Sequence, residues 1–241
     1  MQIIRADDYQ SWVYANQDDL VAVDPWLTQK QVFPKWNWLL YRGSSKQAYL
    51  IKNNLLEQVT HLIITAHFSD HLDLDSLNLF KKDIPIYTTH GASKVLIKSG
   101  FTNITIVQIN QLYELNSLKL KVYQAGKPYN STTFAYSLSD RRSKIFHEPH
   151  MFNNKLKIDN VDACIMTVDM VKVLGLIQVS MNLDQAKLAQ SILNAKYFLP
   201  TGIAPSRTNG LISFLLTIKE SYNRNHIMPF ICKEIGDSVS I

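Results

Sequence analysis

The sequence of 241 residues has few cysteines, no long apolar run and no signal-peptide pattern, and each of these absences excludes a class of protein. It contains two cysteines, and Cys164 lies in an apolar run far from Cys232, so we expect reduced thiols in a cytoplasmic protein. No apolar run approaches the roughly 18–20 residues that a membrane helix needs. The first twenty residues include Arg5 and several aspartates, which is not the pattern of a signal peptide. These absences predict a protein that does not associate with membranes.

Familiar nucleotide and catalytic motifs are also missing. The sequence has no G-x-G-x-x-G, no Walker A motif, no G-x-S-x-G and no C-x-x-C. The formal net charge is +5, but the basic residues are scattered, with short pairs only at Lys81-Lys82 and Arg141-Arg142. This distribution predicts weak affinity for small anions and no dedicated face for nucleic acid.

The hydrophobic pattern predicts a mixed α and β protein. Hydrophobic residues make up 46% of the chain and charged residues 19%, which favours one globular domain over residues 1–241. A helix is expected over 183–193, with Leu188, Ile192 and Leu193 on its buried face, and a last helix over 211–218. Short apolar or alternating segments predict strands at 2–5, 11–15, 20–24, 62–65, 84–88, 104–109, 118–125, 132–138, 143–147, 163–166 and 197–200.

The most informative stretch is residues 62–75. The apolar run 62–64 has the length and β-branched content of a buried strand, and a polar loop with His67, Asp70 and His71 follows it directly. A helical pattern begins near Asp73 or Asp75. Imidazole nitrogens and carboxylate oxygens are ligands that Zn²⁺, Mn²⁺ and Fe²⁺ accept, so this loop is a candidate metal site.

This stretch resembles the H-x-H-x-D-H signature of the metallo-β-lactamase superfamily. Asp70 and His71 occupy the last two signature positions, whereas Ala66 and Phe68 replace the first two histidines, and the role of His67 stays open. The order Ser11-Trp12, turn, strand, Asp24-Pro25-Trp26 resembles the N-terminal strands of the sugar-lactonase-like branch. The resemblance implies a four-layer αββα sandwich of two mixed sheets flanked by helices.

The resemblance also implies further metal ligands at the ends of later strands. Gly126 stands where the third histidine is expected, and Thr201-Gly202 where the last one is expected. Glu148-Pro149-His150 replaces the bridging aspartate. We therefore expect at most one divalent ion, Zn²⁺, Mn²⁺ or Fe²⁺, held by Asp70, His71 and His150 with one position left for water. Glu148 and Asp24 are the expected catalytic residues, which accept a proton or orient that water.

Two hypotheses about function follow from this degenerate motif. The first is a hydrolase of an ester, a lactone or a phosphodiester that uses one metal ion. The second is a pseudo-enzyme with no metal, which binds a small anionic ligand or a partner in the cleft where the family has its active site. Residues 26–45 are rich in aromatic residues and show no clear period, so we expect a loop that packs over the sheet or covers the cleft. The pattern predicts neither the substrate nor the oligomeric state.

Overall fold

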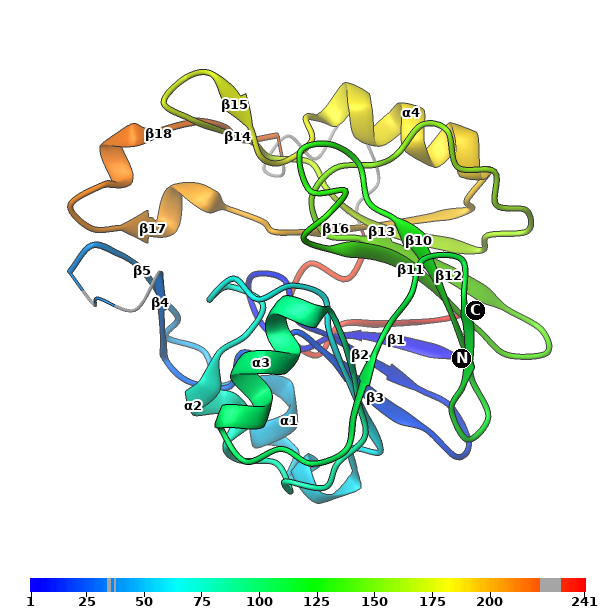
Figure 1. Ribbon diagram of the computed structural model, residues 1–241. Helices are drawn as coiled ribbons and strands as arrows, with labels where there is room; N and C mark the ends of the chain where they lie inside the picture. Colours follow the sequence, from blue (N-terminus) through cyan, green and yellow to red (C-terminus); the bar gives the residue numbers. More distant parts are fainter. Residues whose placement is uncertain (34–35, 37, 222–230) are drawn as a thin grey trace.

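The computed structural model describes residues 1–33, 36, 38–221 and 231–241. Its centre consists of two mixed β-sheets that pack face to face (Figure 1). The first sheet has the strand order β19-β1-β2-β3-β6-β7-β8, in which β3, β6, β7 and β8 are parallel neighbours. Its strands are β1 (Gln2–Arg5), β2 (Trp12–Ala15), β3 (Leu20–Val23), β6 (His61–Ile64), β7 (Ile86–Thr88), β8 (Ile104–Ile106) and β19 (Ser238–Ser240).

The second sheet has the order β16-β13-β12-β11-β10-β9. Strands β12, β13 and β16 run parallel, and the others are antiparallel. The strands are β9 (Leu112–Glu114), β10 (Lys119–Gln124), β11 (Phe134–Ser139), β12 (Lys144–Glu148), β13 (Ala163–Thr167) and β16 (Tyr197–Thr201). The alternating residues of 118–147 thus form the antiparallel half of this sheet, as their period of two predicts.

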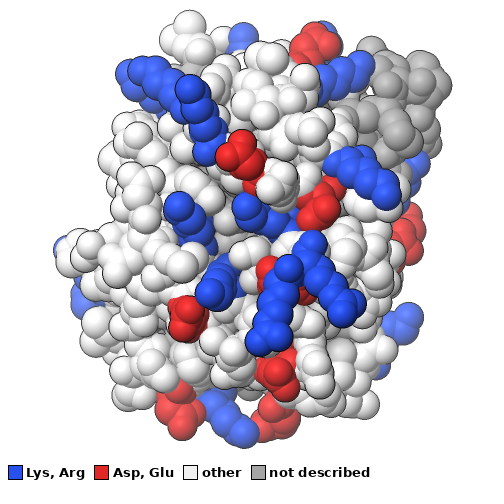
Figure 2. All heavy atoms as spheres, turned by 90° about the vertical axis from the view of Figure 1, so that its right-hand side faces the viewer, with Lys and Arg blue, Asp and Glu red and all other residues white. Residues whose placement is uncertain are grey.

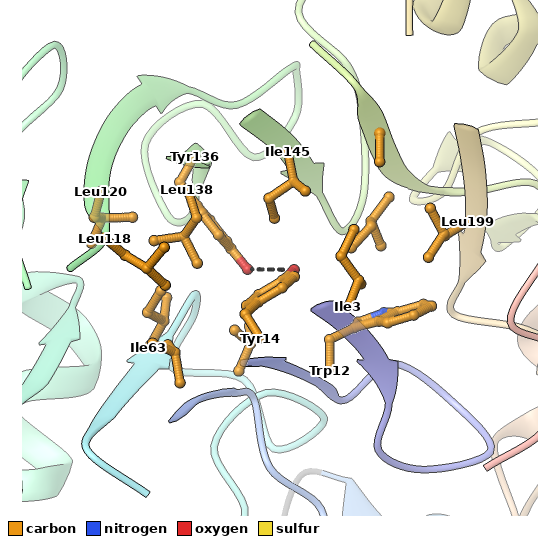
Figure 3. Packing of buried hydrophobic residues seen from close by; sticks show 14 of the residues in the cluster. Ile3, Trp12, Tyr14, Ile63, Leu118, Leu120, Tyr136, Leu138, Ile145 and Leu199 are labelled. Atoms are coloured by element: carbon orange, nitrogen blue, oxygen red, sulfur yellow. Dashed lines mark hydrogen bonds between the residues drawn. The ribbon is translucent and has the colours of Figure 1, made fainter. Parts of the chain in front are cut away.

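The main core fills the space between the two sheets. Figure 3 shows Trp12, Tyr14 and Ile63 of the first sheet facing Ile145 and Leu199 of the second. A second core lies under α4 (Leu183–Leu193), and a third lies under α1 (Tyr49–Lys52), α2 (Leu74–Leu77) and α3 (His90–Lys98). The helices therefore cover the two outer faces, which confirms the predicted αββα sandwich.

Helix α4 has the predicted bounds but a different buried face. Asn182 and Gln185 form a capping box at its start. Leu188 and Ile192 are 51% and 38% exposed, so the predicted stripe was wrong for these two residues. The side chains that pack on the sheet are Leu183, Ala186, Ala189 and Leu193.

Two small sheets project from one side of the sandwich, at the left of Figure 1. One consists of β4 (Lys30–Phe33), β5 (Leu40–Gly43) and β17 (Thr208–Asn209), and the other of β14 (Met170–Val173), β15 (Ile177–Gln178) and β18 (Leu216–Lys219). The segment 26–45 is thus partly a hairpin rather than a loop. The helix predicted over 211–218 was wrong, because Leu216–Lys219 pairs with β14 and only a short 3-10 turn, η3 (Ser213–Leu215), precedes it. Two further 3-10 turns are η1 (Leu56–Gln58) and η2 (Pro205–Arg207).

No helix in the described part of the chain has both the length and the hydropathy required to cross a bilayer.

Candidate metal centre

Three predicted ligands from two sheets meet at one edge of the sandwich. Asp70 and His71 lie on the loop after β6, and His150 lies two residues beyond β12. One ligand atom of each lies within 4.8 Å of the others. His71 Nε2 is 3.0 Å from His150 Nε2 and 3.5 Å from the Asp70 carboxylate. The structure therefore brings together the three residues whose proximity the sequence predicts.

Asp24 fixes the orientation of the His71 ring. The Asp24 carboxylate accepts a hydrogen bond of 2.7 Å from His71 Nδ1, and it also accepts hydrogen bonds from the Thr65 N–H (2.8 Å) and the Thr65 hydroxyl (2.6 Å). These residues meet because β3 and β6 are parallel neighbours, so the residues that follow them lie side by side. With its Nδ1 proton held by Asp24, His71 directs Nε2 towards Asp70 and His150, which is the arrangement typical of a histidine that ligates a metal.

The charges of the two histidines differ. Burial opposes a charge on His71, but the carboxylates of Asp70 and Asp24 outweigh it and raise the pKa of His71 to about 9. Burial, together with the charge of His71, lowers the pKa of His150 well below its ordinary value. In the metal-free protein at neutral pH, His71 Nε2 therefore donates to a neutral His150. A divalent ion would take the place of that proton, because metal ligands bind in their deprotonated form.

The donor set fits a single divalent ion. Two imidazole nitrogens at about 2.0–2.1 Å from a zinc ion lie roughly 3.4 Å apart at a tetrahedral angle, and the two Nε2 atoms here are already at 3.0 Å. His150 Nδ1 is buried and has no hydrogen-bond partner among the described residues.

Glu148 lies behind His150. Its Oε1 accepts hydrogen bonds from the N–H groups of His150 (3.0 Å) and Met151 (3.4 Å), while Oε2 is buried and has no partner among the described residues. Burial raises the pKa of Glu148 to about 8, so its carboxyl is protonated at neutral pH. His147 points into the core instead, where its Nδ1 lies 2.8 Å from the Tyr136 hydroxyl.

A cavity of about 580 Å³ opens beside Asp70 and His150. The ring of Tyr129 packs against His150 with the ring centroids 4.1 Å apart and an interplanar angle of 30°. Neither Asp24 nor Glu148 lines the cavity, and none of the lining residues in the described part of the chain is lysine or arginine. Its walls are mainly apolar or aromatic, with contributions from Tyr9, Leu40, Phe68, Tyr129, Pro149, Val171, Val179, Pro205 and Leu216.

A larger cavity of about 990 Å³ lies elsewhere, beside the chain termini, and includes Arg141 and Arg142 but none of the three predicted ligands. Figure 2 shows the face of the molecule on the side of the termini, where lysine and arginine side chains gather with acidic side chains between them. We place the candidate site at the smaller cavity, because the convergent donors lie there.

The positions of the missing family ligands hold no metal donor atoms. Ala66 is fully buried, and Phe68 lines the cavity. A Cβ atom on Gly126 would overlap the carbonyl oxygens of Met151 and Phe152, so this position admits no side chain. Gly202 lines the cavity with φ +58. His67 also lines the cavity but does not belong to the group of three convergent donors.

Two residues of the site were not predicted from the sequence. Thr65 could have been found, since it ends the strand predicted over 62–65 and begins the loop that carries Asp70 and His71. Tyr129 lies in the connection between β10 and β11, and no sequence pattern indicates that its ring covers His150.

The layered fold and the His/Asp cluster at a sheet edge define a protein of the metallo-β-lactamase architecture. The family model described as "Beta-lactamase superfamily domain" matches residues 4–202, so the chain belongs to this superfamily. The sugar-lactonase-like branch stays a prediction. No curated protein matches the sequence.

Solved structures share the fold at low sequence identity. A possible metal-dependent hydrolase from Veillonella parvula is 14% identical with a TM-score of 0.71, and the match covers 100% of this chain and 99% of the other. An isothiocyanate hydrolase from Delia radicum gut bacteria is 12% identical with a TM-score of 0.73, over 100% and 99% of the two chains. Igni18, a metallo hydrolase from Ignicoccus hospitalis, is 14% identical with a TM-score of 0.64, over 99% and 98%. At these identities the likeness shows the fold alone.

Proposed function

We propose that this protein is a hydrolase that uses one divalent metal ion, and that its substrate is a neutral ester or lactone with apolar substituents. The observation that carries the proposal is the convergence of Asp70, His71 and His150 beside an apolar cavity, with His71 oriented by a buried carboxylate. Three protein ligands leave one coordination position open, as a catalytic site requires. A divalent ion in this site would act as a Lewis acid and supply a water nucleophile at neutral pH.

The two buried carboxyl groups near the ligands, those of Asp24 and Glu148, have different proposed roles. Asp24 is a positioning residue, because its carboxylate contacts His71 and Thr65 and does not line the cavity. Glu148 is the proposed proton donor, since a carboxyl that is protonated at neutral pH suits a general acid. Because Glu148 does not line the cavity, it acts there through a relay or through a movement of the turn at 149–150.

The lining of the cavity supports a neutral substrate over an anionic one. A bound divalent ion would offset the charge of Asp70, but away from the ion the described lining residues include no lysine or arginine that could recognise a negatively charged substituent. The phosphodiester and the anionic ligand expected from the sequence are therefore less well supported than an ester or a lactone.

Metal-dependent thermal stabilisation tests the proposal. Zn²⁺ or Mn²⁺ at about one hundred times Kd should stabilise the wild type by about 2.7 kcal/mol. At roughly 2–4 °C per kcal/mol for a domain of this size, the melting temperature should rise by about 5–11 °C. His71→Ala and His150→Ala should lose this rise, whereas the matched control His67→Ala, which changes a cavity-lining histidine outside the group of three, should keep it.

Two results would separate the hypotheses. A wild-type protein whose melting temperature is insensitive to divalent metals contradicts the hydrolase proposal. If metal stabilises the protein but neither p-nitrophenyl esters nor aliphatic lactones are hydrolysed faster than in buffer with metal, the non-catalytic binding module is the better description.

A further inference from the structure

Half of the large exposed apolar side chains of the described residues gather on the two small sheets. Leu176 is 83% exposed and Phe214 76% exposed, values far above those of an ordinary partly covered side chain. We define the apolar rim as Trp36, Trp38, Leu174, Leu176, Ile177, Leu211 and Phe214. A concentration of this kind usually marks an interaction surface.

The rim is continuous, although its members come from three segments of the chain. The N–H of Leu211 donates to the carbonyl of Trp38 (3.0 Å), and the N–H of Leu174 donates to the carbonyl of Leu215 (2.8 Å). The rings of Trp36 and Trp38 stack with an interplanar angle of 4°. Both small sheets project from the same side of the sandwich, opposite the termini (Figure 1).

The charge of the rim has one sign. The segments 28–43, 170–179 and 208–219 contain no aspartate or glutamate, and their charged residues are lysines and one arginine. Lys219 is exposed and Lys172 partly exposed, and the two residues lie on the paired strands β18 and β14. Arg42 is fully buried against backbone carbonyls, so it contributes no surface charge. The three segments are thus apolar and carry basic charges alone, and two acidic residues border them: Asp169, which is buried, and Glu220, which is partly exposed and accepts hydrogen bonds from Ser206.

We infer that the apolar rim docks on the surface of an anionic lipid bilayer. Tryptophan side chains favour the membrane interface, where the ring meets both the acyl chains and the headgroups. Lysine side chains near an anionic leaflet add electrostatic attraction to the lipid headgroups. A second copy of the chain would instead bring surfaces of the same charge together. Such docking departs from the sequence-based prediction of no membrane association, which depended on the lack of a spanning helix. Docking of this kind needs no such helix, because the apolar residues enter only the boundary between headgroups and acyl chains.

The rim also borders the candidate site. Leu40, Val171 and Leu216 line the cavity and belong to the same small sheets as the rim. Docking would therefore place the cavity mouth near the bilayer, whether or not the protein is a hydrolase.

Vesicle flotation of the full-length, metal-free protein tests this inference. At low salt, the wild type should float with vesicles of phosphatidylcholine that contain about 30% phosphatidylserine, and a smaller fraction should float with pure phosphatidylcholine.

The variants test which residues bind. The triple variant Trp38→Ser, Leu176→Ser and Phe214→Ser should bind at least tenfold more weakly. The double variant Lys172→Glu and Lys219→Glu should bind several-fold more weakly. The matched control, Arg141→Glu with Arg142→Glu beside the termini, should bind as the wild type does. All substituted side chains in the apolar variant are exposed, so circular dichroism should show an unchanged fold.

Three outcomes would overturn the inference. The wild type could fail to float with anionic vesicles at low salt. The control variant could lose binding while the rim variants keep it, which would assign binding to the face shown in Figure 2. Light scattering could show a dimer that the apolar variant converts to a monomer, with no flotation of either, which would make the rim a contact between two copies. None of these measurements depends on metal binding or catalysis, so failure here and failure of the proposed function are distinguishable.

Discussion

Replacement of Asp24 by asparagine should weaken both the fold and the metal site. Asp24 is buried and accepts three hydrogen bonds, from the Thr65 N–H, the Thr65 hydroxyl and His71 Nδ1. Asparagine retains one carbonyl oxygen, but its amide group cannot accept from His71. The backbone φ of Asp24 is +43°, which asparagine also tolerates, so the substitution tests the carboxylate and not the backbone.

The expected magnitudes follow from these contacts. Loss of a buried charged hydrogen bond costs about 1.5–3 kcal/mol, and at roughly 2–4 °C per kcal/mol the metal-free variant should melt about 3–12 °C lower. Loss of the residue that orients a ligating histidine lowers metal affinity about 10–100-fold. At a fixed metal concentration well above Kd, this loss of affinity lowers the metal-dependent stabilisation by about 1.4–2.7 kcal/mol.

Competition titration with a chromophoric chelator, alongside thermal melts, measures both effects. Thr65→Val is the matched control, because it removes a hydroxyl that lies 2.6 Å from the Asp24 carboxylate and 2.9 Å from His71 Nδ1 but leaves the hydrogen bond between His71 and Asp24 in place. It should lower stability by about 1 kcal/mol while changing metal affinity by less than roughly threefold. The reasoning is refuted if Asp24→Asn binds metal as tightly as the wild type does, or if Thr65→Val weakens binding equally.

Three further predictions concern the missing ligands and one buried carboxyl. Gly126→Ala should lower the free energy of unfolding by about 1–3 kcal/mol in urea titrations, because its methyl group would overlap the carbonyls of Met151 and Phe152; unchanged stability would contradict the packing. Elemental analysis should find at most one zinc ion per chain and nitrocefin should be hydrolysed no faster than in buffer, since Ala66, Phe68 and Gly126 offer no donor atoms; two ions at full occupancy would disprove this. Burial raises the pKa of Asp7 to about 6, so its stabilising contribution is present below pH 3.8 and is lost as the pH rises through 6. Relative to Asp7→Asn, the wild type should therefore lose about 2.4 kcal/mol of unfolding free energy between pH 4 and 7, and parallel profiles would count against the buried charge.

The sandwich was predictable because its strands carry clear local patterns. Leu62 to Ile64 is a short buried run, and residues 118–147 alternate, so each strand indicates its own length and exposure. The end of the chain was not predictable in this way. Leu211 to Ile218 is apolar with no decisive period, and its final strand forms through pairing with β14, far away in the sequence. Pairing between distant segments decided the structure there, and local propensity did not.

Helix α4 shows a second limit of local patterns. Its bounds follow from a capping box, which depends on neighbouring residues alone. Its buried face depends on how closely it approaches the sheet. The small residues Ala186 and Ala189 pack there, and the larger Leu188 is left exposed. A rule that places the largest apolar side chains inside therefore selects the wrong stripe.

The candidate site was also predictable only in part. Asp70, His71 and His150 follow predicted strands within a few residues, and the family resemblance, not a local pattern, predicted that these strand ends meet at one edge. The contact of Tyr129 with His150 depends on the path of a long connection, which no local pattern determines.

One residue that the sequence resemblance aligns with a family ligand, Phe68, also lines the cavity beside the three convergent donors. The ring centroid of Phe68 lies 4.5 Å from that of His67 and 6.2 Å from that of Tyr129, and the ring of Tyr129 packs against His150. A wall of aromatic rings therefore replaces donor atoms next to the remaining ligands. Restoring a histidine at position 68 alone would put a polar group into this wall without partners, because Ala66 and Gly126 still offer no donor atoms and Gly126 has no space for a side chain. The missing ligands are thus better understood as parts of an apolar binding surface than as isolated losses, and the remaining three donors are suited to a single ion at its edge.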